Sequence, residues 1–299
     1  MNDDIAVVVP TVGRASLDVL LDALDEQGVP RSALHVVHDV DGRGPAATRN
    51  RGWRDADATW IAFLDDDVVP SPGWYEQLRR DLICMPDDVA GVQGRLTVPL
   101  PVDRAPTDWE RNVAGLARAR WATADMAYRR DVLAEVGGFD ERFPRAYRED
   151  ADLGLRVVAR GYRIVRGARH VSHPVRPAPW HVSITKQAGN ADDALMRRLH
   201  GPGWRARAGV PRGARRRHVA STLALVTAAV LAPVRPRAAR VAAAGWIAST
   251  ARFAWRRIAP GPRTPSEIAT MVATSAVVPL AATTWWVIGT VTSARSRPG

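Results

Sequence analysis

Apolar runs alternate with helical segments through the first 67 residues of the chain. Residues 5–9 (IAVVV), 33–40 (ALHVVHDV) and 60–67 (WIAFLDDD) predict three strands. Residues 15–27 carry leucines at helical spacing and end at a glycine and a proline, and a shorter helix is expected after the glycine-containing loop that follows the second strand. Parallel neighbours in a sheet require crossover connections, so this order predicts an α/β fold with a parallel sheet covered by helices.

Acidic residues gather where two of these strands end. Asp39 and Asp41 follow the second strand, and Asp65–Asp67 close the third. Ligands of open α/β sheets bind beyond the carboxyl ends of strands, and three adjacent carboxylates repel one another unless a positive partner is near. Asp65 and Asp67 could share a divalent ion such as Mg²⁺ or Mn²⁺, because both ions prefer oxygen ligands. The alternative is an acidic turn or a helix cap before the SPGW segment.

Five further segments occur in a diagnostic order: VVVPTVGR, GPAATRNRGW, WIAFLDDDVVPSPGW, GGFDERF and REDADLGLRVVARG. Together they resemble the family 2 glycosyltransferases, over about residues 5–175. The resemblance implies the Rossmann-like GT-A fold, with a mixed, mainly parallel sheet and flanking helices. It also implies an inverting enzyme that moves a sugar from a nucleotide-diphosphate sugar to a glycan, lipid-linked or other cell-surface acceptor. A sugar-phosphate nucleotidyltransferase and a non-enzymatic, basic nucleic-acid-binding protein are the alternatives.

The resemblance assigns roles to individual residues. Asp150, in the RED segment, matches the proposed general base. The residues implied to bind the nucleotide and the donor are Pro10, Thr11, Arg14, Asp39, Asp41, Arg49, Asn50, Asp65 and Asp66. The residues implied to hold Mg²⁺ or Mn²⁺ are Asp67, Asp65 and His173. The residues implied at the sugar and acceptor pocket are Asp125, Trp121 and Glu149.

Several of these roles have a purely structural alternative. Glu149 and Asp150 could be acidic residues that stabilise a helix N-terminus. Arg49 could be a surface cation, His173 a loop histidine beside a proline, and Trp121 a packing residue. The loop between the second-strand acids and the ATRN segment is short, where many family members insert a helix and a strand. The choice between Asp39 and Asp41 as the contact to the nucleotide base therefore stays open.

The charge of the chain is unevenly distributed. The formal net charge is +11, and residues 194–299 hold 17 arginines but only one acid, Glu267, which leaves a net charge of −5 for the first 193 residues. Between Asp193 and Glu267 the chain has no acidic residue, so we place a boundary near residue 200. It separates a catalytic domain, 1–200, from a basic, apolar helical tail, 201–299. Because the surplus lies in an apolar tail, we expect contact with an anionic membrane surface and no nucleic-acid partner.

The tail contains three apolar stretches, at residues 219–234, 241–254 and 268–294. The last has 27 residues without a charge, which exceeds the ~20 residues that span a bilayer. The first two are shorter and favour amphipathic helices lying in the membrane interface, with a basic helical subdomain as the alternative. The acidic start of the chain, its short first apolar run and the lone cysteine indicate a reducing compartment. We therefore expect attachment to the cytoplasmic side of the cell membrane.

Overall fold

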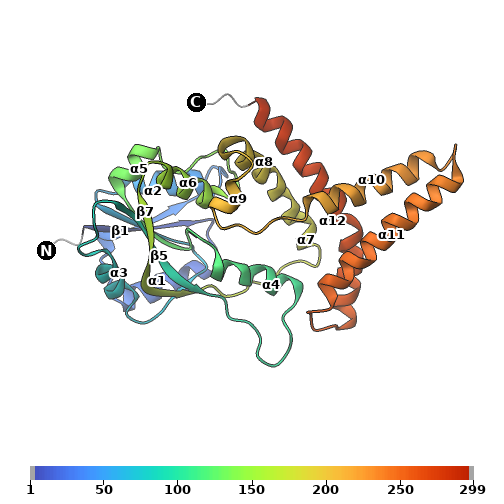
Figure 1. Ribbon diagram of the computed structural model, residues 1–299. Coiled ribbons are helices and arrows are strands. Elements are labelled where there is room, and N and C mark those ends of the chain that lie inside the picture. Colours follow the sequence, from blue (N-terminus) through green and yellow to red (C-terminus); the bar gives the residue numbers. More distant parts are fainter. Residues whose placement is uncertain (1–3, 296–299) are drawn as a thin grey trace. The chain divides into compact units, whose positions relative to one another are not determined.

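The computed structural model describes residues 4–295, which Figure 1 shows as a ribbon. They form two compact units, and each unit is built from three separate stretches of the chain. The first unit comprises the chain up to Pro99, Ala114–Val175 and Arg205–Val210, and the second comprises Leu100–Val113, Arg176–Trp204 and the chain from Pro211. Residues 100–113 and 176–200, which the sequence boundary groups with the N-terminal part, thus pack within the second unit.

A seven-stranded mixed sheet runs through the first unit in the order β2-β1-β3-β6-β5-β7-β4. Its strands are β1 (Ile5–Thr11), β2 (Leu34–His38), β3 (Trp60–Leu64), β4 (Val69–Pro70), β5 (Val89–Thr97), β6 (Asp125–Arg129) and β7 (Arg163–Ser172). β1 pairs in parallel with β2 and β3, and β5 pairs in parallel with β7. β6 is antiparallel to both β3 and β5, and β4 is antiparallel to β7. The sheet is therefore mixed with one prevailing strand direction, which confirms the expected fold class.

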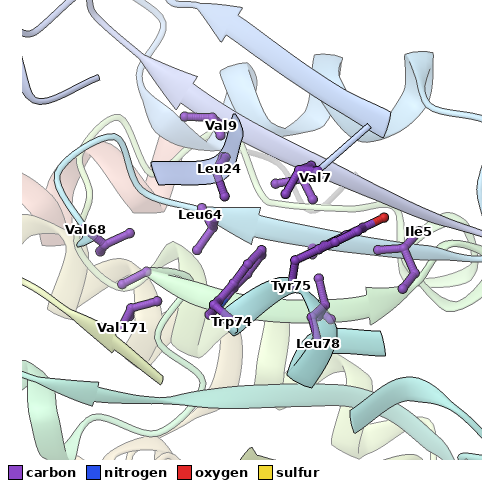
Figure 2. Packing of buried hydrophobic residues seen from close by; sticks show 14 of the residues in the cluster. Ile5, Val7, Val9, Leu24, Leu64, Val68, Trp74, Tyr75, Leu78 and Val171 are labelled. Atoms are coloured by element: carbon purple, nitrogen blue, oxygen red, sulfur yellow. The ribbon is translucent and has the colours of Figure 1, made fainter. Parts of the chain in front are cut away.

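The α-helices of the first unit are α1 (Ser16–Glu26), α2 (Pro45–Asp55), α3 (Trp74–Leu82), α5 (Arg130–Val136) and α6 (Glu149–Ala159). The 3₁₀ turns Arg31–Ala33 and Gly115–Arg118 complete it. α1 buries Leu17, Leu20 and Leu24, which the helical period places on one face. Figure 2 shows Leu24 with Val7 and Trp74 in the core beside the sheet. Each such side chain contributes about 1.5–3 kcal/mol when it is fully buried.

Strand register brings several chain segments to one edge of the sheet. The parallel strands β1 and β3 both end there, so Thr11 and the turn at 65–67 lie at the same edge. β6 runs the other way and begins there, because Leu64 pairs with Asp125. The expected third strand thus ends at Leu64, and the three aspartates form the turn that follows it.

The second unit is helical, apart from its connecting loops. Its helices are α4 (Asp108–Ala114), α7 (Val182–Thr185), α8 (Gly189–His200), α10 (Arg215–Leu231), α11 (Pro236–Ile258) and α12 (Pro265–Arg295), with a 3₁₀ turn at Lys186–Ala188. The short α9 (Trp204–Arg207) joins α8 to the segment that returns to the first unit. α10 and α11 form an antiparallel hairpin in Figure 1. Within the described residues, α12 is the one helix whose length and apolar character would allow it to cross a membrane.

The first two tail helices differ from the expected amphipathic pattern. The arginines of α10 cluster at its start, and those of α11 lie near both of its ends. An amphipathic helix instead carries its charges along one face. Several apolar side chains between these arginine groups are exposed, namely Leu223, Val226, Val230, Val241 and Ile247.

Candidate functional site

Arg49 lies at the centre of the charged cluster at the sheet edge. It is 2% exposed and belongs to the buried face of α2. Its Nη2 donates to Oδ1 of Asp65 at 2.6 Å, and its Nη1 donates to Oε1 of Glu149 at 2.9 Å. Burial alone would lower the pKa of Arg49, but the two carboxylates outweigh it and raise that pKa above its ordinary value. Arg49 is therefore a permanently charged link between the end of β3 and the start of α6, rather than a surface cation.

Asp66 points inward, away from solvent. Its Oδ2 accepts a hydrogen bond from Oγ1 of Thr11 at 2.6 Å, and its Oδ1 pairs with Nη1 of Arg14 at 2.6 Å. The carboxylate is 2% exposed. Asp66 consequently holds the loop after β1 against the turn after β3. Pro10, opposite Val37 in the parallel ladder, is a buried part of β1 immediately before this loop.

Asp67 and His173 form a second pair at this edge. Oδ1 of Asp67 lies 3.3 Å from Nε2 of His173, and the two residues are 8% and 9% exposed. Nδ1 of His173 lies 3.2 Å from the carbonyl oxygen of Pro174. A proton on Nδ1 would leave the lone pair of Nε2 directed to a metal, which is how metal-binding histidines are usually oriented.

The carboxylate of Asp67 and the imidazole of His173 fit a hard divalent ion that also binds water or phosphate oxygens. One carboxylate and one imidazole can bind such an ion, and waters or phosphate oxygens would complete its shell. Among residues 4–295, no group of three or more metal-ligating side chains is assembled. Asp65, the expected third ligand, pairs with Arg49, and its role as a metal ligand stays a prediction.

Two adjacent carboxylates begin α6. Glu149 is 3% exposed, and its Oε2 has no hydrogen-bond partner within the described part of the chain. Burial, together with the charge of Asp150, raises the pKa of Glu149. Asp150 is partly exposed, and burial raises its pKa despite a hydrogen bond that its Oδ1 accepts from the Ala151 amide at 2.6 Å. A carboxylate with a raised pKa is the stronger base, so Asp150 is suited to accept a proton.

Both the donor and the acceptor atoms of the Asn50 side-chain amide form hydrogen bonds within the first unit. Its Nδ2 donates to the carbonyl oxygen of Phe139 and to Oε1 of Glu141, each at 2.8 Å. Its Oδ1 accepts from the Phe139 amide at 2.8 Å and from Nε1 of Trp53 at 2.9 Å. An amide side chain has two donors and two acceptor positions, and all four are occupied here. Asn50 thus ties α2 to the turn after α5, while its role as a donor contact stays a prediction.

The acids after β2 occupy different environments. Asp39 closes the loop before α2, because its two carboxylate oxygens accept hydrogen bonds from the amides of Arg43 at 3.0 Å and Gly44 at 2.9 Å. The Asp41 side chain is 62% exposed, and its Oδ2 lies 3.8 Å from Nη1 of Arg51. Asp41 is the more accessible of the two carboxylates.

Asp125 and Trp121 lie in the interior of the first unit. Oδ1 of Asp125 pairs with Nε of Arg169 at 2.7 Å, and Oδ2 accepts from Nε1 of Trp74 at 3.0 Å. Trp121 is 4% exposed and packs on Gly154, where a Cβ atom would lie 2.3 Å from Cε3 of the indole. The acceptor role of both residues stays a prediction. The structure gives Asp125 an ion pair and a hydrogen bond, and it gives Trp121 a packing contact.

Arg169 is an important residue that the sequence did not reveal. Its side chain is fully buried between Asp125 and Asp81, with the Arg169–Asp81 ion pair at 3.2 Å. Two glycines make room for these carboxylates. A Cβ atom at Gly94 would lie 2.0 Å from Asp125 Oδ2, and one at Gly167 would lie 2.1 Å from Asp81 Oδ2. Glycines inside strands were the available signal, because they often mark a close approach of neighbouring groups.

Comparisons with known proteins agree with this architecture. Residues 14–151 match the family model described as glycosyl transferase family 2. A pre-mycofactocin glycosyltransferase of Mycobacterium tuberculosis is 31% identical over 144 residues, which are 44% of this chain and 30% of that protein. An O-antigen biosynthesis protein of Myxococcus xanthus is 29% identical over 170 residues, which are 48% of this chain and 13% of that protein. The chain therefore aligns with less than a third of the length of either relative.

A solved structure shares the fold over nearly the whole chain. It is a mannosyltransferase from Pyrobaculum calidifontis in complex with GDP-mannose and Mn²⁺. The superposition covers 98% of this chain and 87% of the mannosyltransferase, with a TM-score of 0.50 and 18% sequence identity. At this identity the similarity establishes the fold.

Proposed function

Because residues 14–151 match the glycosyl transferase family 2 model, we propose that the protein is a family 2 glycosyltransferase that transfers a sugar with inversion from a nucleotide-diphosphate sugar. Its acceptor is a glycan, a lipid-linked sugar or another component of the cell surface. The observation that carries this proposal is the cluster at the end of β3, where buried Arg49 joins Asp65 to Glu149 beside Asp150. A nucleotidyltransferase is less well supported, since the chain has a single lysine, Lys186, and no glycine-rich loop that carries one.

Asp150 acts as the general base of this reaction. An inverting transfer needs one carboxylate to take the proton of the acceptor hydroxyl while the nucleotide diphosphate departs from the opposite face of the sugar. The raised pKa of Asp150 makes its carboxylate a better proton acceptor. Arg49 acts through its two partners, because its buried guanidinium holds Asp65 and Glu149 in place and offsets their charges.

Asp67 and His173 hold a divalent ion, Mg²⁺ or Mn²⁺, in the complex with the donor. When bound, the ion neutralises charge on the diphosphate and stabilises its departure. The proximity of Asp67 Oδ1 to His173 Nε2 supports this assignment, as does the presence of GDP-mannose and Mn²⁺ in the similar mannosyltransferase. Asp66, Thr11 and Arg14 shape the loop that borders the nucleotide.

The helices of the second unit attach the protein to the cytoplasmic leaflet of the membrane. Three features support attachment: the apolar length of α12, the exposed apolar side chains of the α10–α11 hairpin and the arginines near the helix ends. Anionic lipids attract juxtamembrane arginines with about 1 kcal/mol for each residue near the surface.

Two substitutions test the catalytic assignment. The full chain is assayed with a panel of nucleotide sugars and Mn²⁺ for donor hydrolysis or transfer, and donor affinity is measured by calorimetry. Asp150→Asn should keep donor affinity and lose turnover by about 10²–10⁴-fold, the typical contribution of a general base. Asp67→Asn should lose the metal-dependent part of donor binding.

Asp88→Asn is the matched control for the general base, because that carboxylate is 54% exposed and precedes β5, outside the candidate site. Its turnover at saturating donor should stay near that of the wild type. Unchanged turnover in Asp150→Asn would show that Asp150 is not the general base. Metal-dependent donor binding that survives in Asp67→Asn would show that Asp67 does not hold the ion.

A further inference from the structure

The second unit contains a cavity of its own, with a volume of about 200 Å³. It is formed by the start of α4, the segment that leads into α7, and residues of α11 and α12. Every residue that lines it belongs to this unit. At about 30 Å³ per water molecule, the cavity has room for roughly seven waters, or for a single sugar ring.

Two tryptophans line this cavity. Trp180 is 61% exposed, which is unusual for the largest apolar side chain. Trp109 is held more firmly, because its Nε1 donates to the carbonyl oxygen of Arg176 at 2.8 Å. The face of an indole ring is electron-rich and apolar, so it attracts polarised C–H groups such as those on the apolar face of a sugar ring. The open face of Trp180 is therefore available to a ligand that is apolar on one side and polar on its edges.

The charged groups of the cavity disfavour an anion. Asp108, Glu267 and Arg257 all line it. Nη2 of Arg257 pairs with Oδ2 of Asp108 at 2.9 Å, and its Nη1 donates to the hydroxyls of Thr274 and Ser275. This arginine is thus fully engaged with protein groups. The lining residues Asp108, Glu267 and Arg257 sum to a formal charge of −1, and Arg111, whose Nη2 lies 3.5 Å from Oδ1 of Asp108, balances it.

The carboxylates are positioned as acceptors for hydroxyl donors. Oε1 of Glu267 accepts from the Asp108 amide at 2.8 Å, which ties the start of α12 to the start of α4. Glu267 is the only acid between residues 194 and 299, and it lies at this cavity. A carboxylate has about four acceptor positions, so one such bond leaves capacity for hydroxyl groups of a ligand.

The hydroxyl of Ser183 is a second, independent observation that favours a polar ligand. Its Oγ atom is buried and makes no hydrogen bond to any of residues 4–295. A buried hydroxyl without a partner costs about 1–3 kcal/mol, so such groups usually meet a water or a ligand. Ser183 lines the same cavity as Trp180 and Glu267.

We propose that this cavity binds one ring of a neutral saccharide. The apolar face of the ring packs on Trp180, and its hydroxyls bond to Glu267, Asp108 and the orphan hydroxyl of Ser183. The role of this saccharide as acceptor rests on the proposed glycosyltransferase function, and the cavity then specifies an uncharged glycan in preference to a sugar phosphate. The binding itself requires neither donor nor turnover.

The experiment measures binding to the full chain in the absence of donor. Methyl α-mannoside, methyl β-glucoside and methyl β-galactoside are titrated with detection by saturation-transfer NMR and tryptophan fluorescence, and mannose 6-phosphate and choline are run beside them. At least one neutral glycoside should bind saturably, with saturation transfer strongest to ring C–H protons. Trp180→Ala should weaken that binding at least tenfold.

Trp255→Ala is the matched control, because Trp255 is 62% exposed on α11 of the same unit and does not line this cavity. It should leave glycoside binding unchanged, whereas Ser183→Ala should weaken it severalfold. If the wild-type chain binds none of the glycosides, or if mannose 6-phosphate or choline binds more tightly than all of them, the proposal is overturned. Saccharide binding without any transfer activity would overturn the proposed function alone, and transfer without this binding would overturn the cavity assignment alone.

Discussion

In residues 65–67, three adjacent carboxylates each pair with different residues of the protein. Asp65 meets Arg49, Asp66 meets Arg14 and Thr11, and Asp67 meets His173. A single divalent ion was the partner expected for the pair Asp65 and Asp67. The protein itself supplies cations to two of the three carboxylates, so the ion proposed here concerns Asp67 and His173. The turn geometry sends adjacent side chains in different directions, which makes this separation possible.

At the residue scale, the largest predicted loss of stability comes from replacing Arg49. Arg49→Met would leave Asp65 and the buried Glu149 without their counter-charge. Breaking a buried ion pair by removing one partner costs about 3–5 kcal/mol, so the free energy of unfolding in urea should fall by that amount. Arg51→Met is the control on the same helix, since its side chain is 42% exposed and a surface change stays within about 0.5 kcal/mol. Equal stability of the two variants would contradict the buried role of Arg49.

The raised pKa of Asp150 predicts a pH dependence of turnover. The base works only when it is deprotonated, so kcat/KM should fall as the pH drops through the pKa of Asp150. Burial raises that pKa, and the acidic limb should therefore lie above ~4, the ordinary value for aspartate. A pH profile of kcat/KM with a stable donor checks this. An acidic limb at or below pH ~4 would show that Asp150 is not the titrating base.

At the scale of elements, α4 depends on a capping box at its start. The Thr107 amide donates to Oε2 of Glu110 at 2.7 Å, and the Glu110 amide lies 3.3 Å from Oγ1 of Thr107. This reciprocal arrangement satisfies two amides that the helix leaves free. Arg104 adds two hydrogen bonds to the same carboxylate, at 2.7 and 2.8 Å. The box thereby positions Asp108 and Trp109 at the cavity of the second unit.

Glu110→Gln should reveal this cap as a pH-dependent loss of stability. The hydrogen bonds from Arg104 hold the pKa of Glu110 down at about 2, below its unfolded value. A lowered folded pKa stabilises the protein above the unfolded pKa, ~4.3, and this contribution disappears as the pH falls toward 2. The variant should lose about 1 kcal/mol at pH 7 by guanidinium unfolding, and the difference should narrow toward pH 3.

The exposed Glu76 on α3 is the control for this cap, with pairs to Arg79 and Arg80 that span one helical turn. Glu76→Gln should cost about 0.3–0.5 kcal/mol or less at pH 7. A loss in Glu110→Gln that does not change with pH would contradict a cap made by the charged carboxylate.

The contact between α6 and Trp121 reverses the usual effect of a helical glycine. Replacing glycine by alanine inside a helix normally stabilises it by about 1 kcal/mol. At Gly154 the new methyl group would meet the buried indole of Trp121 at 2.3 Å. Gly154→Ala should therefore destabilise the protein by about 1–3 kcal/mol in thermal unfolding. Gly115→Ala, where nothing lies within 4 Å, should leave Tm nearly unchanged or raise it.

At the scale of the whole molecule, the two compact units do not correspond to two halves of the sequence. α8 packs against α12 so closely that a Cβ atom at Gly289 would lie 2.4 Å from Cα of Ala191. A truncation near residue 200 would therefore remove the helix on which α8 rests. Membrane attachment is better tested by point changes in the tail than by its deletion.

The exposed apolar residues of the α10–α11 hairpin predict how the protein meets a membrane. Val226→Asp combined with Val230→Asp should abolish flotation of the full chain with vesicles that contain anionic lipid, because two charges replace exposed apolar contacts. Val12→Asp, which changes a 60% exposed valine of the first unit, should float like the wild type. Flotation of the double variant that is equal to the wild type, or release of the wild type by salt alone, would contradict apolar insertion of this hairpin.

The sequence by itself determined several elements, the fold class and the resemblance to a family. Apolar runs, helical leucine spacing and breaker residues placed β1, α1 and β3 within a few residues, because these signals act over short distances. The order of the five quoted segments pointed to the family whose model matches residues 14–151, and the uncharged stretch at 268–294 predicted α12.

Only the tertiary structure decided which charges meet and which segments share a core. Arg49 and Glu149 are 100 residues apart, and Asp125 and Arg169 are 44 apart, so no local pattern links them. The antiparallel insertion of β6 between β3 and β5 and the exchange of segments between the two units are likewise consequences of long-range packing. A buried charge is stable only when an opposite charge or a hydrogen bond compensates it, and distant parts of the chain supply that partner here. Arg49 accordingly pairs with Asp65 and Glu149, and Arg169 pairs with Asp125 and Asp81.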